Sequence, residues 1–328
     1  MPLSEFALIE RYFRGRGAKR ADVRLGVGDD AALLECPPGL ELVAAIDTLV
    51  AGVHFPAGSP PASIGHRALA VNLSDLAAMG ARPAWALLAL TLPAADEGWL
   101  SEFAEGFAAL ARAHDVALVG GDTTSGPLCV TVQILGHVSR SAALLRSGAR
   151  PGDLVFVSGT PGDAAGGLAV EQGRLTPPGE IATYLRKRFL FPAPRMALGE
   201  SLRNHASACI DVSDGLLGDA GKLAHASGCG VELSFADIPV SDLLVRAVGE
   251  ERARELALTG GDDYELCFTV RPSEVGKLRQ ELPPERWGYT HIGVMREASG
   301  AVVTRGGNVM EFSHSGFDHF ASPRTPQN

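Results

Sequence analysis

Carboxylates gather in five short stretches that lie far apart in the sequence. Each stretch sets one or two Asp residues among Gly, Ser or Thr beside an apolar run, at residues 26–30, 46–48, 120–123, 211–215 and 260–263. Asp beside Gly is first of all a turn signal, because the carboxylate accepts local N–H groups and Gly adopts positive φ. The adjacent carboxylates Asp29-Asp30 and Asp262-Asp263, however, repel each other unless a cation lies nearby. We therefore expect the five stretches to converge on one magnesium and phosphate site.

The types of donor favour magnesium over zinc. Mg²⁺ prefers hard oxygen ligands and bridges carboxylates to substrate phosphates, whereas Zn²⁺ is bound mainly by His and Cys. The nine histidines include no HxH or HxxxH pair near an acidic stretch. His54 follows Asp47 after a short loop, so it is either a site residue or a plain surface His.

Sequence motifs that commonly bind phosphate do not fit. The chain has no GxxxxGK[ST] loop. Residues 26–31 match GxGxxA, but Pro37-Pro38 prevents the long helix that should follow this dinucleotide fingerprint. Phosphate contacts are therefore expected from the N–H groups of Gly120-Gly121, from Ser213 and from Arg146, although an arginine such as Arg146, taken alone, is more often a solvated linker residue. No GxSxG elbow or Cys-His motif indicates a covalent nucleophile, and 6% aromatic residues disfavour a glycosidase cleft.

Composition limits the function classes. The 328 residues are enough for two domains, and 46% hydrophobic residues describe a compact protein. Lys and Arg number 29 against 38 Asp and Glu, giving a net charge of −9 without a dense basic block, so we expect no nucleic-acid or membrane partner. Five scattered cysteines without a CxxC pair predict free thiols in the cytoplasm, with Cys209 and Cys267 packed in the core.

The elements that must position the acidic stretches alternate between helix and strand. In the first half we predict helices over residues 4–14, 62–79 and 97–114, with strands over 23–27, 31–34, 41–46, 84–92, 116–119 and 128–138. The strand at 116–119 is expected to end at Gly120. On the helix over 62–79, Asn72 and Asp75 share one face, whereas Ile64, Ala68 and Val71 mark the packed face.

A polar, basic segment at residues 141–152 suggests a domain boundary. Beyond it we predict strands over 154–158, 208–210, 230–235 and 264–270, helices over 164–172 and 215–226, and two more helices divided by Pro192 and Pro194. Both halves therefore belong to the α/β (α+β) class, the second as an α/β sandwich.

Seven motifs together resemble the thiamine-monophosphate kinase family. The resemblance is colinear from about Glu5 to Phe320 and rests on residues 26–33, 47–55, 70–80, 119–124, 147–153, 211–216 and 260–266. The family shares a superfamily with aminoimidazole ribonucleotide synthetase and selenophosphate synthetase. The resemblance implies a two-domain PurM-like architecture. Residues 1–140 would bind ATP and Mg²⁺ and pair their mixed sheet with a second subunit in a homodimer; residues 150–322 would form the C-terminal domain, and 323–328 a frayed tail.

The resemblance also implies a reaction and its residues. ATP and thiamine monophosphate would give thiamine diphosphate and ADP, with several Mg²⁺ ions and direct in-line transfer. Asp30, Asp47, Asp75, Asp122 and Asp211 match Mg²⁺ ligands, and Asp214 a further one. Asp29 is expected to shape its turn. Gly121, Asp122, Arg146 and Ser213 match ATP-binding positions, and His54, Asp262 and Phe317 match positions near the thiamine substrate.

Three positions depart from the family pattern. Ala45-Ile46 stand where the family often has a hydroxyl residue, so Ile46 would offer only its backbone carbonyl to a metal. Position 262 is often Glu and position 317 often Tyr. Two other functions stay open: another ATP-dependent enzyme of the superfamily, such as the purine-pathway cyclo-ligase, and an inactive Mg²⁺-nucleotide sensor. Selenophosphate synthesis is disfavoured, because the first cysteine is Cys36 in a Pro-flanked loop.

Overall fold

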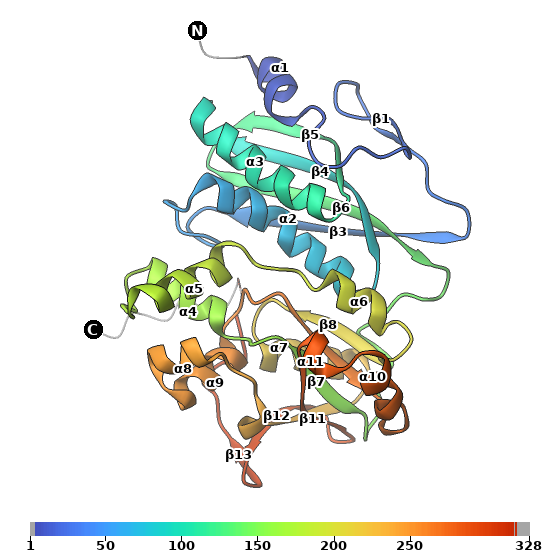
Figure 1. Ribbon diagram of the computed structural model, residues 1–328, viewed down its shortest axis with the longest axis vertical. Helices are drawn as coiled ribbons and strands as arrows, with labels where there is room; N and C mark the ends of the chain where they lie inside the picture. The colour runs from blue at the N-terminus through green and yellow to red at the C-terminus, as the bar shows by residue number, and fades with distance from the viewer. Residues whose placement is uncertain (1–3, 318, 320–328) are drawn as a thin grey trace.

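Each half of the chain builds one main β-sheet, and helices lie between and around the two sheets (Figure 1). The structure is a computed structural model that describes residues 4–317 and 319. The first sheet has four strands in the order β3 (Leu40–Val50), β6 (Cys129–Ser139), β4 (Arg82–Leu92) and β5 (Ala117–Ser125). The hairpin of β1 (Val23–Leu25) and β2 (Leu33–Leu34) is separate from it. The predicted α/β (α+β) class is confirmed.

Two long helices cover one face of the four-stranded sheet. They are α2 (Pro61–Ala78), which begins with a proline at its first position, and α3 (Glu97–Ala113), which is capped by Asp96 accepting from the Trp99 N–H at 3.0 Å. Short α1 (Glu5–Leu8) and a π-helix (Ile9–Phe13) precede the sheet. Alternate residues of the strands point into this core, because side chains on a strand alternate between faces.

The interpretation of α2 as having one packed face was wrong. Asn72, assigned to the polar face, is as fully buried as Ile64 and Ala68. The reason is that α2 lies between the two halves of the molecule and packs on β3, β6 and α3 on one side and on β8 and α6 on the other. Gly199 allows this close packing, because a Cβ there would lie 2.0 Å from the Ala77 carbonyl oxygen.

The other face of the four-stranded sheet is largely open. Leu42 and Ile46 on β3 are 53% and 62% exposed, and they alternate with residues that face the core. Among the described residues, coverage of this face is confined to one end, where Trp85, Ala117 and Val119 pack with residues of the β1–β2 hairpin. A single chain thus leaves apolar side chains of β3 in solvent.

The second sheet has seven strands, mostly antiparallel. Their order is β13 (Asn308–Met310), β12 (Gly300–Arg305), β9 (Gly230–Ser234), β11 (Tyr289–Arg296), β7 (Leu154–Ser158), β10 (Glu265–Val270) and β8 (Ala208–Val212), with only β12 and β9 parallel. Cys209 and Cys267 are free and buried in it, as predicted. No element is predicted from the sequence over residues 242–259 or 272–310, which form three of these strands and several helices.

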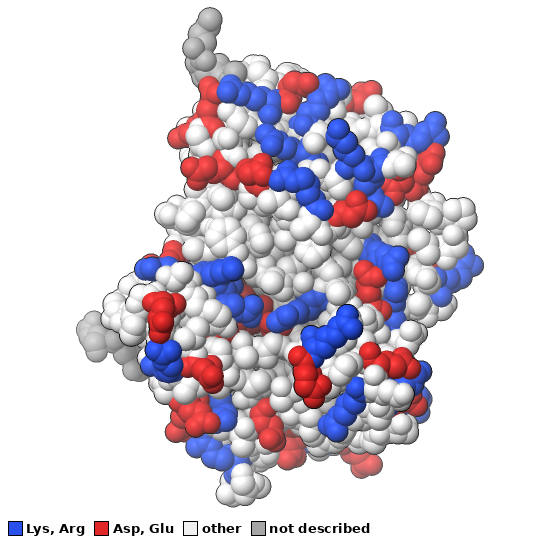
Figure 2. All heavy atoms as spheres, in the orientation of Figure 1, with Lys and Arg blue, Asp and Glu red and all other residues white. Residues whose placement is uncertain are grey.

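The helices of the second half are α4 (Asp163–Glu171), α5 (Gly179–Leu190), α6 (Met196–Leu202), α7 (Leu216–Ala226), α8 (Asp242–Val248), α9 (Glu250–Thr259), α10 (Val275–Glu281) and α11 (Pro284–Trp287). Within the described residues, no helix is long and apolar enough to cross a membrane. Figure 2 shows Lys and Arg side chains interspersed with Asp and Glu on the visible face, and few charged side chains across its middle.

Candidate active site

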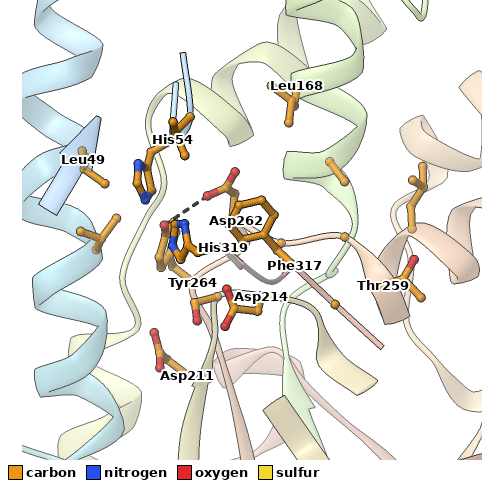
Figure 3. Close-up of a pocket in the computed structure, with 18 of the residues that line it drawn as sticks. Leu49, His54, Leu168, Asp211, Asp214, Thr259, Asp262, Tyr264, Phe317 and His319 are labelled. Atoms are coloured by element: carbon orange, nitrogen blue, oxygen red, sulfur yellow. Dashed lines mark hydrogen bonds between the residues drawn. The ribbon is translucent and has the colours of Figure 1, made fainter. Parts of the chain in front are cut away.

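A cavity of about 1110 Å³ opens between the two halves and collects most of the predicted site residues. Its walls come from the end of β3, from α2, from the turn between β8 and α7, from residues 259–264 and from α4 and α9. Residues 314, 316, 317 and 319 close one side of it. Figure 3 shows His54, Asp262, Phe317 and Asp214 around this space, with Asp211 at one end.

Carboxylates from three separate elements form one end of the cavity. Asp47 lies on the core-facing side of β3, Asp75 near the end of α2 and Asp211 on β8. The Ser74 hydroxyl donates to Asp211 Oδ2 at 2.9 Å. Burial, together with the charges of Asp211 and Asp47, raises the pKa of Asp75 to about 8. Burial and the Asp219 charge raise the pKa of Asp211 to about 6, and burial also raises the pKa of Asp47.

These pKa values are raised by burial and by mutual repulsion between the carboxylates, which the nearby charge of Arg146 offsets only in part. Three oxygen donors with excess negative charge are the set that a hard divalent cation prefers. Over the described residues, no group of three or more Asp, Glu, His or Cys side chains is already arranged as a metal site. The donor type and the charge of Asp47, Asp75 and Asp211 therefore suit magnesium, although their side chains are not arranged as a coordination shell.

The turn between β8 and α7 is held by a residue that the sequence analysis missed. Asp219 Oδ2 accepts the backbone N–H groups of Ser213, Asp214 and Gly215 at 2.9, 3.0 and 3.2 Å. Lys222 Nζ donates to Asp219 at 2.8 Å and to Asp214 at 2.5 Å. Ser213 and Asp214 both line the cavity, but Asp214 is already paired with Lys222. An Asp in the first turn of a helix is a known anchor for such N–H groups, which is the signal that could have identified it.

Arg146 lies near the carboxylates although its side chain does not line the cavity. It is exposed, and its positive charge lowers the pKa of both Asp75 and Asp211, offsetting part of the burial effect. Its backbone carbonyl accepts from Ser227 Oγ at 3.1 Å. Arg146 is thus a cation at the edge of the acidic cluster, where an anionic ligand would meet it.

The adjacent carboxylates Asp262 and Asp263 do not share a cation. Asp263 is buried and accepts the N–H groups of Gly162 at 2.7 Å and Ala164 at 3.2 Å, at the start of α4. Asp262 instead accepts from the Arg67 guanidinium and lines the cavity. The cation beside Asp262 is therefore the Arg67 guanidinium, and Asp263 is held by backbone N–H groups, so this pair does not require a metal ion.

Glu265, the first residue of β10 directly after this loop, was also missed. It is fully buried and accepts hydrogen bonds from Arg188, Arg195 and the Ser158 hydroxyl. Although burial raises its pKa, the bonds from Arg195 hold the pKa of Glu265 below its usual value. The sequence offered no local signal, since Arg188 and Arg195 are at least 70 residues away in the chain.

His54 and Phe317 line the same cavity as the acidic cluster. His54 Nδ1 accepts the Val50 N–H at 2.9 Å, so the hydrogen of the neutral ring lies on Nε2. Burial, with the nearby His319, lowers the pKa of His54 and favours this neutral form. Phe317 is 52% exposed, and its N–H donates to the Asp214 carbonyl at 2.9 Å, which holds its segment against the cavity. The structure therefore places His54, Asp262 and Phe317 in one cavity, and their contact with a substrate stays a prediction.

Two predicted ligands, Asp30 and Asp122, do not reach this cavity within one chain. Asp122 lies on β5, and strand pairing places it level with Thr48 on β3 at the opposite edge of the sheet. Three strand spacings separate them, about 14 Å at roughly 4.8 Å each. Within one chain these two residues therefore do not join the other three stretches, because β3 and β5 are opposite edges of one sheet; convergence of all five stretches on one site stays a prediction.

The stretches that carry them also differ from expectation. Asp29 accepts the Asp30 N–H at 2.8 Å, as expected of a residue that shapes the turn. The strand predicted to end at Gly120 continues to Ser125, so Gly120-Gly121 is not a loop. Gly121 has φ of +149°, and a Cβ there would lie 1.8 Å from the Leu88 carbonyl oxygen. The close approach of β4 therefore accounts for this glycine without a nucleotide.

Comparison with known proteins agrees with this architecture. The AIR synthase related protein, N-terminal domain, matches residues 28–138, and the AIR synthase related protein, C-terminal domain, matches residues 150–305. The fold thus consists of two PurM-like domains, and the chain is a member of the AIR synthase related class.

Relatives within this class define the family more closely. The thiamine-monophosphate kinases of Salmonella typhimurium and Escherichia coli are each 49% identical over 325 residues, covering 98% of this chain and 100% of the relative. The structure of the enzyme from Stenotrophomonas maltophilia superposes with a TM-score of 0.84 at 46% identity, covering 94% of this chain and 99% of the other. AaThiL complexed with AMPPCP and TMP superposes with a TM-score of 0.77 at 32% identity, covering 90% and 92%. The chain belongs to the thiamine-monophosphate kinase family.

Proposed function

We propose that this chain transfers the γ-phosphate of ATP directly to the phosphate of thiamine monophosphate, within the cavity between its two halves. The activity itself, that of an ATP-dependent thiamine-monophosphate kinase, follows from its family. The observation that carries the mechanism is the arrangement of one cavity. Carboxylates suited to a metal-bound triphosphate line the same cavity as His54, Asp262 and Phe317.

Mg²⁺ would be held by Asp47, Asp75 and Asp211. Asp214 would become a further ligand once its ion pair with Lys222 breaks, and the backbone carbonyl of Ile46 would be a nearby oxygen donor. Bound there, Mg²⁺ supplies positive charge that offsets the charge of the phosphates. Ser213 and Arg146 stand next to these carboxylates, and they are proposed to contact the ATP phosphates. Their position at the rim of the acidic cluster supports this assignment.

The acceptor phosphate needs no protein nucleophile or base. A phosphate oxygen of thiamine monophosphate is already anionic, and it would form a bond to the γ-phosphorus while the bond from that phosphorus to the β,γ-bridging oxygen of ATP breaks. ADP leaves with that electron pair, and thiamine diphosphate remains. The residues of the chain act by holding the two phosphates in line, since positioning and charge compensation dominate phosphoryl transfer.

We further propose that the chain acts as a homodimer through the open face of its four-stranded sheet. Leu42 and Ile46 leave that face apolar, and β3 and β5 are the edge strands of the sheet, although residues 16–18 pair with the start of β5. An exposed apolar face and exposed strand edges favour association with a second copy. A twofold pairing of two such sheets would set the β5 edge of one subunit beside the β3 edge of the other. Asp122, and with it Asp30 and Gly121, would then complete the site of the partner. This arrangement explains why these residues lie outside the cavity of their own chain.

In this proposal residues 1–140 form the ATP-binding and dimerisation domain and residues 150–322 the second domain, in a cytoplasmic enzyme. The part of the second domain beyond residue 319, and the tail predicted at 323–328, lie outside the described residues.

One assay tests the function. The purified chain is incubated with ATP, Mg²⁺ and thiamine monophosphate, and ADP and thiamine diphosphate are quantified by chromatography. We expect ADP release that depends on the acceptor. Asp47→Asn should lower the rate at least about a hundredfold, whereas Asp115→Asn, which changes an exposed carboxylate outside the cavity, should leave it unchanged.

Other outcomes select the alternatives. ATP binding without turnover would identify a nucleotide sensor. ADP release that ignores thiamine monophosphate and responds to a purine-pathway precursor would identify a cyclo-ligase. Near-normal turnover of Asp47→Asn would remove Asp47 from the metal site.

A further inference from the structure

Arg67 reaches from the first half of the molecule into the wall of the cavity. It lies on α2, and its side chain is only 2% exposed. The guanidinium donates to the Phe189 carbonyl oxygen at 2.6 Å and to the Asp262 carboxylate. It also lies over the Phe189 ring at 4.6 Å and near the Tyr264 ring at 5.7 Å. All these partners belong to the second half, so Arg67 connects α2 to the loop that carries Asp262.

The backbone of that loop is held in an unusual conformation. Asp262 has φ of +73° and Tyr264 has φ of +52°, a region that residues other than glycine rarely adopt. The N–H groups of Asp262 and Tyr264 donate to the carbonyls of Ser213 and Val212, both at 2.8 Å. Backbone strain of this kind persists only where the surroundings hold it, and here it turns the Asp262 side chain toward Arg67 and the cavity.

The two oxygens of Asp262 have different surroundings. Arg67 and the Tyr264 hydroxyl, at 3.2 Å, both donate to Oδ1. In the part of the chain that the structure describes, no group donates to Oδ2, and the Asp262 side chain is partly exposed to the cavity. Figure 3 shows the carboxylate between His54 and Phe317, with the bond to Tyr264 dashed. Oδ1 of Asp262 is thus held by its donors, whereas Oδ2 is left to accept from a ligand in the cavity.

We propose that Arg67 is a positioning residue for the phosphoryl acceptor. It fixes Asp262 so that Oδ2 accepts from, or pairs with, an N–H-bearing or cationic group of the acceptor. This rests on the proposed function, in which the acceptor carries a cationic ring. The planar fork of arginine contacts a carbonyl and a carboxylate at once, which the single ammonium of lysine does with less directional control.

A double-mutant cycle on the full-length protein tests the proposal. Asp262→Asn, Arg67→Met and the double variant are compared with the wild type for kcat and for the KM of each substrate. We expect Arg67→Met to raise the KM for thiamine monophosphate at least about tenfold while the KM for ATP stays within about twofold. The double variant should be no worse than Asp262→Asn alone, because residues that act through one another are not additive.

Additive effects, or equal rises in the KM for both substrates, would overturn the proposal, since a merely structural arginine would act in that way. If Arg67→Met does not fold, Arg67→Lys carries the same test, and a wild-type KM for thiamine monophosphate in that variant contradicts the idea. The matched control is Arg82→Met, which removes an exposed arginine paired with Glu200 between the two halves, away from this cavity. We expect wild-type kinetics from it.

The failure of the proposed function would be seen separately. A wild-type protein that makes no thiamine diphosphate refutes the function. Calorimetric titration of the same variants with thiamine monophosphate alone still measures whether Arg67 acts through Asp262. Equal affinities in the wild type and Arg67→Met would then refute the role of Arg67.

Discussion

The buried carboxylates should make the metal-free protein less stable as pH rises. The pKa of Asp75 is about 8 in the folded chain, against about 3.9 for an unfolded Asp. Between these values the folded chain keeps a proton that the unfolded chain has released, so the free energy of unfolding falls with increasing pH. The slope for one such group is about 1.4 kcal/mol per pH unit. From pH 6 to pH 8, where the folded group begins to ionise, the loss is about 2 kcal/mol.

Asp211 contributes at lower pH. Its folded pKa of about 6 places its share of the loss mainly between pH 4 and pH 6. Magnesium that binds only the folded chain would reverse the effect, because it stabilises the ionised carboxylates and binds more tightly as their protons leave. Stabilisation by magnesium should therefore be larger at pH 8 than at pH 6.

Urea denaturation at fixed pH measures both effects. The free energy of unfolding is determined at pH 6 and pH 8 in EDTA and again in millimolar MgCl₂, for the wild type, Asp75→Asn and the control Asp115→Asn. We expect the pH-dependent loss in EDTA for the wild type and the control, and a much smaller loss for Asp75→Asn. An identical pH slope in Asp75→Asn, or magnesium stabilisation that is equal at both pH values, would refute the reasoning.

Two further predictions concern the four-stranded sheet. Gly121→Ala should lower the free energy of unfolding by at least about 2 kcal/mol, measured by urea denaturation, because its Cβ would lie 1.8 Å from the Leu88 carbonyl oxygen. Gly120→Ala should change the free energy of unfolding by less than about 0.5 kcal/mol, because its Cβ would meet only a side-chain carbon at 3.5 Å. Equal losses in the two variants would contradict the steric argument. Leu42→Asp should yield a monomer of low activity by light scattering and assay, whereas Val309→Asp, on β13 and even more exposed, should stay dimeric and active. A dimeric Leu42→Asp would place the interface elsewhere.

Local signals in the sequence were sufficient for the elements around the site. Pro60-Pro61 and Gly80 bound the helix that became α2, and apolar runs located β4, β6, β7 and β10. These predictions succeeded because helix starts and buried strands depend on residues close together in the chain. Weaker patterns between residues 272 and 310 gave no assignment, because short strands that pair with distant partners carry little local signal.

The sequence by itself determined the family, and with it the chemistry of the acidic stretches. Long motifs such as residues 70–80 and 260–266 can be identified from their residue types alone, without knowledge of the fold. Only the tertiary structure decided which carboxylates share a cavity. It placed Asp47, Asp75 and Asp211 together and Asp122 at the far edge of the sheet.

Asp262-Asp263 show the same contrast between what the sequence and the tertiary structure determine. In the sequence, this pair of like charges is interpreted as a sign of metal. Arg67 lies 195 residues before Asp262, and Gly162 lies 101 residues before Asp263. The charge of a side chain is fixed by its residue type. Whether that charge meets a cation, an arginine or a helix N-terminus depends on contacts that form only when distant segments pack together.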